Sequence, residues 1–397
     1  MKNRGEHKMP FDIEQSDRLQ KLPPYLFVEI DKAKRRALEE GKDVIDLGVG
    51  DPDQPTPKFI LEAIHKASLN PENHRYPTNK GFFELRIEIA RWYKARFNVE
   101  LDPDREILPL IGSKEGIAHM PLAFLNKGDV GLIPDPAYPP YNSGVIFAGG
   151  EPYRMPLLAK NAFLPDLNHI KHNALSRAKL MFLNYPNNPT SSVCDGAFFN
   201  EVVKFAYKHN IIVCHDAAYG ELSFDGLKTE SFLSAKDAKS IGVEFHSFSK
   251  IFNMTGWRLG FVCGNSKVIE GLAKLKANID SGVVNAIQSA GIEGLKRIDK
   301  VTKEAKTLYE KRRNVFVDGL NKAGWAVTKP KATFYVWAPV FGRHTSATLA
   351  REILEKCDVV VTPGNGFDPG GEGYVRMALT VGEFRLKEAV DRIRKII

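Results

Sequence analysis

The sequence has little cysteine and no long apolar run, and each absence excludes a class of protein. Its four cysteines are widely spaced and form no CxxC pair, so we expect reduced, packed thiols and neither a disulfide framework nor a metal site. No stretch reaches the roughly 18 uninterrupted apolar residues of a membrane-spanning helix, and the charged N-terminus lacks the apolar core of a signal peptide. These features predict a cytoplasmic protein without a membrane partner.

Two common phosphate-binding motifs are also missing. The sequence contains neither GxGxxG nor the Walker spacing GxxxxGK[ST], which leaves dinucleotide sites and P-loops without support. Lys and Arg total 56 against 48 Asp and Glu, a formal charge of +8, and such an excess favours polyanionic partners. Most basic residues, however, are mixed with acidic ones, as in residues 32–40, and no basic stripe interleaved with aromatic residues occurs. We therefore expect no nucleic-acid partner.

The composition that is present is that of an ordinary globular protein. With 43% apolar and 26% charged residues, the 397-residue chain can bury a sizeable core in two domains. Intrinsic disorder, collagen-like repeats and small disulfide-stapled folds are excluded.

From about residue 43 to 265, short apolar runs alternate with amphipathic segments, a pattern typical of βαβ units and a largely parallel sheet. Apolar residues at helical spacing, such as Phe199, Val202 and Ala206, indicate helices between the runs. Pro109 interrupts the first strand, which predicts that this strand lies at a sheet edge. The predicted strands are Ile107–Ile111, Val130–Ile133, Leu180–Leu183, Ile211–Cys214, Phe245–Phe248 and Leu259–Cys263.

After about residue 267 the pattern indicates a second, smaller α+β domain. A charge-rich helical stretch runs through Lys303–Arg313, and a strand-like segment at Thr333–Trp337 precedes a further helix at Ser346–Lys356. Near the N-terminus, Leu26–Glu40 is helical and is expected to pack on this second domain. The predicted division is an N-terminal arm over residues 1–45, a large domain over 46–283 and a small domain over 284–397.

Polar residues follow several predicted strands at their carboxyl ends, where an open α/β sheet forms its ligand crevice. Asn187–Thr190, His215–Tyr219 and Ser247–Lys250 each come just after a strand, and so does Pro136–Tyr138. Gly112–Gly116 follows the first strand and opens a helix, whose free backbone N–H groups favour a phosphate. Together these segments predict one ligand crevice that includes an anion site.

Each of these residues has an ordinary structural interpretation when taken alone. Asp216 after a strand is more often a helix cap or a turn former, and Lys250 is more often a solvated surface residue. Tyr138, in a proline-rich loop, would usually serve packing. Only the combination of the segments favours a functional site.

The segment Ser247–Lys250, followed by Thr255–Gly260, resembles the cofactor-lysine signature of the class I/II aminotransferases, which use pyridoxal 5′-phosphate and adopt fold type I. Asn188–Thr190 and Asp216–Tyr219 match that family in order and spacing, and the resemblance extends from Asp46 to Arg376. It implies an α/β fold with a large domain on a mostly parallel seven-stranded sheet, plus a smaller α+β domain. It also implies a ping-pong transfer of amino groups between small amino acids and 2-oxo acids.

The same resemblance implies roles for individual residues. Lys250 resembles the lysine that forms a Schiff base with the cofactor and then moves the proton. Asp216 is similar to the carboxylate that keeps the pyridine nitrogen protonated, and Asn188 and Tyr219 match the pair that binds the phenolic oxygen. Tyr138 matches the aromatic residue that stacks on the ring. The residues that resemble the phosphate-binding set are Ser113, Lys114, Ser247, Ser249 and Arg258.

Contacts with substrate and with a second subunit are implied in the same way. Arg376 is similar to the arginine that binds the substrate α-carboxylate, a task suited to a planar, bidentate fork. Gly50 matches a glycine that lets the backbone approach the substrate. The resemblance implies that Tyr138 and Asn188 contact the substrate as well. Tyr76 resembles a tyrosine that reaches the phosphate of the neighbouring subunit, which implies a homodimer with shared active sites.

Three segments look like the LL-diaminopimelate aminotransferases: residues 24–30, 110–117 and 362–373. This likeness implies transfer between LL-2,6-diaminopimelate and 2-oxoglutarate, with tetrahydrodipicolinate and glutamate as the other pair, in lysine biosynthesis. By the same match Tyr25, Lys114 and Asn285 contact the substrate. The alternatives are an aspartate, alanine or aromatic aminotransferase or a carbon–sulfur β-lyase on the same scaffold, and, more remotely, a cofactor-free basic binding protein.

One residue departs from the family pattern. Ser191 follows Asn188-Pro189-Thr190 at a position where the family usually has glycine. Glycine would permit a backbone conformation that serine resists, so the turn after Asn188 is not covered by the resemblance.

Overall fold

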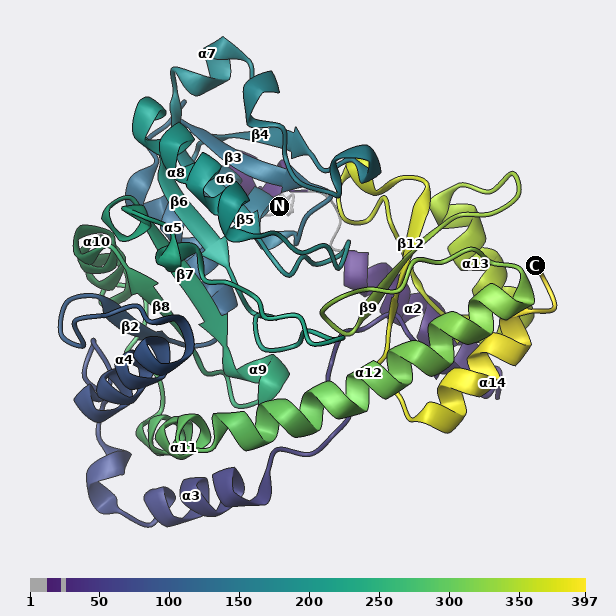
Figure 1. Cartoon of the computed structure of the whole chain (residues 1–397), viewed down its shortest axis with the longest axis horizontal. Coiled ribbons are helices and arrows are strands. Elements are labelled where there is room, and N and C mark those ends of the chain that lie inside the picture. The colour runs from purple at the N-terminus through teal and green to yellow at the C-terminus, as the bar shows by residue number, and fades with distance from the viewer. Residues whose placement is uncertain (1–12, 23–25) are drawn as a thin grey trace, which may run out of the picture.

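A computed structural model of the chain describes residues 13–22 and 26–397 (Figure 1). Within these residues the strands form three sheets, of seven, three and two strands. Figure 1 shows the large sheet and its helices on one side, the smaller β-structure on the other, and the long helix α12 (Ile298–Ala323) running between them. The predicted α/β fold with a seven-stranded, mostly parallel sheet is confirmed.

The large sheet has the strand order β2-β8-β7-β6-β5-β3-β4. Strands β4, β3, β5, β6 and β7 pair in parallel, whereas β8 is antiparallel to both β7 and β2. The strand with Pro109 lies at one edge, as predicted. The sequence did not indicate β4, because this opposite edge strand has only one buried residue and lacks an apolar run. The bounds are β2 (Ile107–Leu110), β3 (Val130–Asp135), β4 (Glu151–Pro156), β5 (Ala178–Asn184), β6 (Ile212–Asp216), β7 (Gly242–Ser247) and β8 (Gly260–Gly264).

Helices cover both faces of this sheet and enclose two apolar cores. Leu180 and Phe182 of β5 face the core with α5, α6 and α10, whereas the alternate residues Met181 and Leu183 face the core with α4 and α8. Because both faces are buried, the strands read as near-continuous apolar runs. The helices of this part are α3 (Lys58–Ser68), α4 (Phe83–Phe97), α5 (Ser113–Phe124), α6 (Pro140–Phe147), α7 (His172–Leu175), α8 (Gly196–His209), α9 (Phe248–Ile251) and α10 (Ser266–Lys276).

The two ends of the chain fold together. Strand β1 (Ile45–Asp46) pairs in parallel with β10 (Val359–Val360). Asp43 accepts hydrogen bonds from Arg385 and Arg392 at 2.7 and 2.6 Å. The remaining elements are α1 (Asp17–Gln20), α2 (Leu26–Glu39), α11 (Asn285–Leu295), α13 (Ser346–Cys357), α14 (Glu383–Ile393) and the antiparallel strands β11 (Thr362–Pro363), β12 (Tyr374–Ala378) and β9 (Tyr335–Pro339).

The predicted domain boundaries stay a prediction. Helix α11 follows the proposed boundary at residue 283 and packs against α3 and α4, helices that come before that boundary. Helix α12 then connects the two parts of the molecule (Figure 1).

Two expectations concern the thiols and the membrane. All four cysteines are free, and Cys214, Cys263 and Cys357 are buried, as the sequence predicted. None of the helices in the described ranges is both long and apolar enough to cross a bilayer.

Candidate active site

A cavity of about 260 Å³ opens at the carboxyl ends of β5, β6 and β7. It is therefore in the crevice where an open α/β sheet binds its ligands. Nine of the predicted site residues line it: Gly50, Ser113, Tyr138, Asn188, Asp216, Tyr219, Ser247, Lys250 and Arg376. Val49, Asn184, Ala218 and Tyr335 complete the wall.

Lys250 brings a primary amine into this cavity from the short helix α9. Ser247 caps the helix, because its side chain accepts a hydrogen bond from the N–H of Ser249 at 3.2 Å. The Lys250 Nζ donates to the carbonyl oxygen of Gly50 at 3.0 Å and lies 5.7 Å from the ring centroid of Phe334. The amine is thus held at the cavity wall, within reach of a bound carbonyl compound.

Asp216 places a carboxylate at the end of β6. The residue is 5% exposed, and its carboxylate accepts hydrogen bonds from the Tyr141 hydroxyl at 2.8 Å and the Ala218 N–H at 3.1 Å. Burial raises the pKa of Asp216, and the hydrogen bond from Tyr141 opposes this only in part. A cationic group of a ligand would stabilise the ionised form of this acid.

Arg376 projects from β12 into the opposite wall and is 1% exposed. Its guanidinium donates to Asn188 Oδ1 and to the Gly48 carbonyl oxygen, each at 2.8 Å. It also lies 4.2 Å from the Tyr335 ring centroid and 4.6 Å from that of Phe367. Burial lowers the pKa of Arg376, so a carboxylate that entered this cavity would meet a poorly solvated cation.

Tyr335 is a cavity residue that the sequence did not single out. It begins β9, inside a segment read only as a strand, and no motif marks it. Its hydroxyl lies 2.9 Å from the Tyr219 hydroxyl. A β-carbon on Gly50 would overlap the Tyr335 ring and hydroxyl. The family match links the missing side chain of Gly50 to the approach of substrate. In this structure its absence makes room for Tyr335.

The start of α5 contributes Ser113 to the cavity that Lys250 lines, and its chemistry suits an anion. Gly112 precedes the helix at φ +76°, and a side chain there would overlap the Arg258 guanidinium. A β-carbon on Gly260 would lie 2.6 Å from the Ser113 backbone nitrogen, so two glycines allow close approach. Free N–H groups at a helix start, together with Arg258 and the Ser247 hydroxyl, suit a phosphate. Ser249, also predicted for this set, is buried and does not line the cavity.

Four further predicted residues, Arg258, Lys114, Asn285 and Tyr76, are not among the residues that line this cavity. Lys114 lines a separate groove of about 1220 Å³. Asn285 is buried at the start of α11, where its amide nitrogen donates to the Arg75 carbonyl oxygen at 3.1 Å. Tyr76, next to Arg75, is 87% exposed. Tyr25 lies outside the described residues.

Ser191 adopts the backbone conformation expected of the family glycine. Its φ is +59°, in the left-handed region that costs energy for residues with a side chain. The serine is buried, and its hydroxyl bonds to Thr333 Oγ1 and to the Tyr335 carbonyl oxygen, each at 2.8 Å. The turn after Asn188 is therefore maintained without glycine and is tied to β9.

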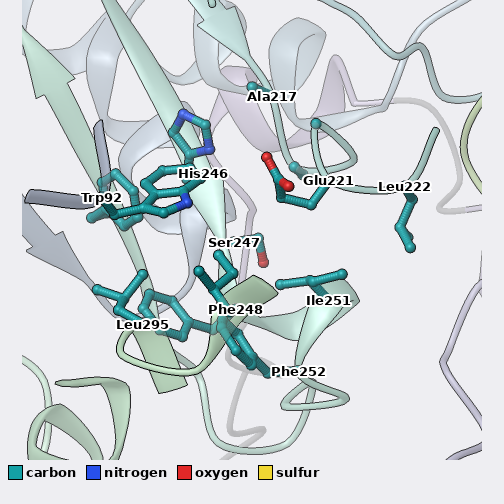
Figure 2. Close-up of a pocket in the computed structure, with 14 residues that line it drawn as sticks. Trp92, Ala217, Glu221, Leu222, His246, Ser247, Phe248, Ile251, Phe252 and Leu295 are labelled. Carbon is teal, nitrogen blue, oxygen red and sulfur yellow. The ribbon is translucent and has the colours of Figure 1, made fainter. Parts of the chain in front are cut away.

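A packed layer supports the site from behind. A space of about 30 Å³, large enough for about two water molecules, separates the segment after Asp216 from α9. Figure 2 shows Phe248, Phe252 and Leu295 close together on the side of Ser247 that faces away from His246. The side chains around this space are mostly apolar, and they pack beneath the segment that carries Ser247 and Lys250.

Comparisons with known proteins agree with this geometry. The sequence profile described as aminotransferase class I and II matches residues 42–393. An LL-diaminopimelate aminotransferase of Moorella thermoacetica is 52% identical over 97% of this chain and 99% of its own length, and one of Halothermothrix orenii is 50% identical over 96% and 98%. Among solved structures, substrate-bound BacF from Bacillus subtilis is similar, with a TM-score of 0.93, 41% identity and coverage of 97% of this chain and 98% of that chain.

The residues around the cavity fit the cofactor on which this family depends. The Lys250 amine suits an aldehyde, the buried Asp216 carboxylate suits a protonated ring nitrogen, and the start of α5 suits a phosphate. All three groups line one cavity. The chain belongs to the class I and II aminotransferase family and is a transaminase that depends on pyridoxal 5′-phosphate.

Proposed function

We propose that this enzyme transfers an amino group between LL-2,6-diaminopimelate and 2-oxoglutarate, giving tetrahydrodipicolinate and glutamate, on the route to lysine. The observation that carries the proposal is that relatives named LL-diaminopimelate aminotransferase are about half identical to this chain over nearly its full length. Of the sequence segments typical of that group, residues 110–117 contribute Ser113 to the cavity, and residues 362–373 contribute Asn365 to the groove that Lys114 lines. We place the enzyme in the cytoplasm.

The cavity residues divide the chemistry between them. When bound, the cofactor supplies an electron sink that makes the α-proton of the amino acid acidic. Lys250 would hold the cofactor through its amine. Once the amine of the substrate has displaced it, the free Lys250 Nζ would accept the α-proton of the substrate and pass it to the cofactor. Asp216 would keep the ring nitrogen protonated, because its buried carboxylate would gain a cationic partner there. Asn188 and Tyr219 would donate hydrogen bonds to the phenolic oxygen.

Arg376 selects the α-carboxylate of the substrate. Its planar fork can donate two parallel hydrogen bonds to a carboxylate, and the rings of Tyr335 and Phe367 hold the fork in place. Tyr138, in the loop after β3, would stack on the cofactor ring, while Ser113, Ser247 and Arg258 would bind the phosphate.

The loop at residues 362–373 lies against the end of β3. It is fastened to the end of β3: the Gly370 N–H donates to Asp135 Oδ1 at 2.7 Å, and the Ala137 N–H donates to the Phe367 carbonyl oxygen at 2.9 Å. Lys114 and Asn365 line the adjoining groove. We infer that the distal ammonium and carboxylate of the substrate extend toward this groove, where Lys114 provides a positive charge.

A panel of amino donors tests the substrate assignment. Steady-state kcat/KM is measured with 2-oxoglutarate as the acceptor and LL-diaminopimelate, aspartate, alanine or phenylalanine as the amino donor. Because a site built for polar groups rejects substrates that lack them, LL-diaminopimelate should exceed the aspartate, alanine and phenylalanine values by about a thousandfold. Equal values for aspartate or phenylalanine would favour a general or aromatic aminotransferase. Pyruvate and ammonia formed from a cysteine conjugate without 2-oxoglutarate would identify a β-lyase.

We also propose a homodimer with shared active sites. Tyr76, Ile279 and Val284 are 87%, 50% and 57% exposed and lie near one another, because Asn285 bonds to Arg75 and Gly282 packs against Pro77. The Asn285 Oδ1 is buried without a hydrogen-bond partner among the described residues. A second copy of the chain would cover this apolar face and bring Tyr76 to the phosphate of its partner.

Complementation between two inactive variants tests this arrangement. A co-expressed mixture of Lys250→Ala and Tyr76→Ala chains contains hybrid dimers. If Tyr76 serves the neighbouring subunit, one site of each hybrid has both residues, and the mixture regains activity. If Tyr76 serves its own subunit, or if light scattering shows a monomer, no site is restored and the proposal is wrong.

A further inference from the structure

The buried hydroxyl of Ser191 is part of a closed hydrogen-bond ring that the reaction scheme does not use. Its single hydrogen goes to the Tyr335 carbonyl oxygen, so the hydrogen between Ser191 and Thr333 must come from the Thr333 hydroxyl. Thr333 Oγ1 in turn accepts the Tyr335 N–H at 3.0 Å. The ring thus begins and ends on the backbone of Tyr335, and each hydroxyl group donates one hydrogen bond and accepts one.

Two residues of this ring have a strained backbone conformation, which indicates that the surrounding structure holds them in place. Both Ser191 and Thr333 have left-handed φ values, +59° and +65°, which are uncommon for residues with a side chain and strained for a β-branched one. They are 4% and 0% exposed. The Thr333 N–H also donates to the Leu222 carbonyl oxygen at 2.7 Å. The ring therefore joins the turn after Asn188, the segment after Tyr219 and the start of β9.

Tyr335, whose backbone the ring fixes, contacts both sides of the cavity. Its hydroxyl lies 2.9 Å from that of Tyr219, and its ring lies 4.2 Å from the Arg376 guanidinium. Asn188, three residues before Ser191, accepts a hydrogen bond from Arg376. A shift of β9 relative to the Asn188 turn would therefore change the surroundings of Tyr219 and Arg376 together.

We propose that Ser191 and Thr333 are positioning residues for the transamination reaction: their hydroxyl ring fixes Tyr335, which orients the Tyr219 phenol and the Arg376 guanidinium. With serine at position 191, side-chain hydrogen bonds help to fix Tyr335. A glycine at this position has no side chain, so only the backbone could do so. This inference rests on the aminotransferase chemistry of the site and does not depend on which amino acid is the donor.

A matched pair of variants separates positioning from folding stability. Ser191→Gly removes the hydroxyl and relieves the backbone strain, whereas Ser191→Ala removes the hydroxyl and keeps the strain. We expect the glycine variant to be at least as stable as the wild type toward heat and the alanine variant to be less stable. Both should nevertheless lose about tenfold in kcat/KM, because small misplacements of catalytic groups are costly.

A spectroscopic measurement checks the same point without turnover. The visible absorbance of the cofactor bound to Lys250 is titrated with pH, because the proposed function places the Tyr219 hydroxyl at its phenolic oxygen. Both Ser191 variants should shift the midpoint in the same direction as Tyr335→Phe. In the double variant Ser191→Gly/Tyr335→Phe the two effects should not add, because Tyr335 transmits the effect of Ser191.

A second pair gives an independent check at the other hydroxyl. Thr333→Ser keeps the ring and should behave like the wild type, whereas Thr333→Val breaks it and should reproduce the Ser191→Gly kinetics. Wild-type kcat/KM and an unshifted absorbance titration in Ser191→Gly would overturn the proposal. Activity losses in all variants that follow only the order of thermal stability would assign the ring a purely structural role.

Discussion

Two carboxylates on neighbouring strands are both buried, and their pKa values are shifted in opposite directions. Asp216 ends β6 and is 5% exposed, and Glu244 lies in β7 and is 0% exposed. Burial raises the pKa of both. In Asp216 burial prevails and the pKa stays raised, whereas in Glu244 hydrogen bonds from His215 and His246 outweigh burial and hold the pKa well below its usual range.

The cause of the difference is the number of donors. Glu244 is bonded to His215 Nδ1 at 2.9 Å, to His246 Nε2 at 2.9 Å, to the Phe232 N–H at 2.7 Å and to the Tyr93 hydroxyl at 2.6 Å. Asp216 has the Tyr141 hydroxyl and the Ala218 N–H. A buried charge with a full set of donors holds a structure together, while one with few donors beside a cavity marks a ligand site.

The largest effect should come from Asp216→Asn. Asparagine has the same shape but cannot keep a ring nitrogen protonated, so we expect kcat to fall by about a thousandfold or more, as when a main electrostatic partner of a reaction is removed. The cofactor should still bind, since Lys250 and the phosphate-binding residues are unchanged. Single-turnover absorbance measurements on the loaded variant check this, and near-normal turnover would remove Asp216 from the chemistry.

Glu244→Gln should have the converse effect. The amide keeps one acceptor oxygen but replaces the other with an NH2 group that presents hydrogens to donors already pointing at this position. The network around His215 and His246 therefore loses one acceptor and the negative charge. Breaking a buried, charge-assisted network costs about 3 kcal/mol of folding free energy, but activity per folded molecule should be kept within about twofold. Urea unfolding and active-site titration measure the two quantities.

An exposed ion pair supplies the control for the Glu244 variant. Glu100 accepts a hydrogen bond from Lys94 at 2.9 Å on the surface, and surface pairs contribute little to stability. Glu100→Gln should leave the unfolding curve unchanged. Equal unfolding curves for the Glu244 and Glu100 variants would show that the Glu244 network carries no stability.

The dependence of stability on pH should separate the two acids by sign. The pKa of Glu244 is lowered by folding, so its contribution is full above the unfolded value near 4.3 and is lost as the pH falls below it. The pKa of Asp216 is raised by folding, so in the cofactor-free protein its ionisation opposes folding, and this cost fades as the pH falls toward 3.9. Urea unfolding at pH 8, 6 and 4, at constant subunit concentration, should show Asp216→Asn most stabilised relative to the wild type at pH 8. A stabilisation that grew with acidity would contradict this sign.

The comparison also explains what the sequence could and could not predict. Asp216 and Lys250 follow apolar strands, so their position at the ligand crevice is readable from the strand pattern, and resemblance to a family adds their chemistry. Glu244 lies inside a strand, where an isolated acid has no periodic signal. One of its four donors, His246, is in the same strand, and the other three come from other segments. Tyr335, at the start of β9, likewise has no sequence motif that marks it as a site residue.

The predictable residues are thus those that the chain order alone brings to one edge of the sheet. The others depend on tertiary contacts between segments far apart in sequence, such as the Ser191–Thr333 hydrogen bond. Strand β4 is a related case, because an edge strand with a single buried residue carries no apolar run.

The smallest effect should come from Tyr141→Phe, which removes one of the two hydrogen bonds to Asp216. The ring stacks on Phe182 with centroids 5.2 Å apart, so phenylalanine keeps the packing, and the loss of one buried hydrogen bond to a charged group should reduce kcat by about tenfold. The pKa of Asp216 should rise further because one group that favours its ionised form is gone. If the ionised carboxylate is the active form, the acid limb of the pH–rate profile moves to higher pH.

Tyr185→Phe is the matched control, because the Tyr185 hydroxyl donates to the Phe163 carbonyl oxygen at 2.8 Å, away from the cavity. It should leave both kcat and the acid limb unchanged. An acid limb that stays in place in Tyr141→Phe while kcat falls would mean that Tyr141 orients Asp216 without setting its charge. A limb that moves to lower pH would mean that the donor count does not explain the difference between the two buried acids.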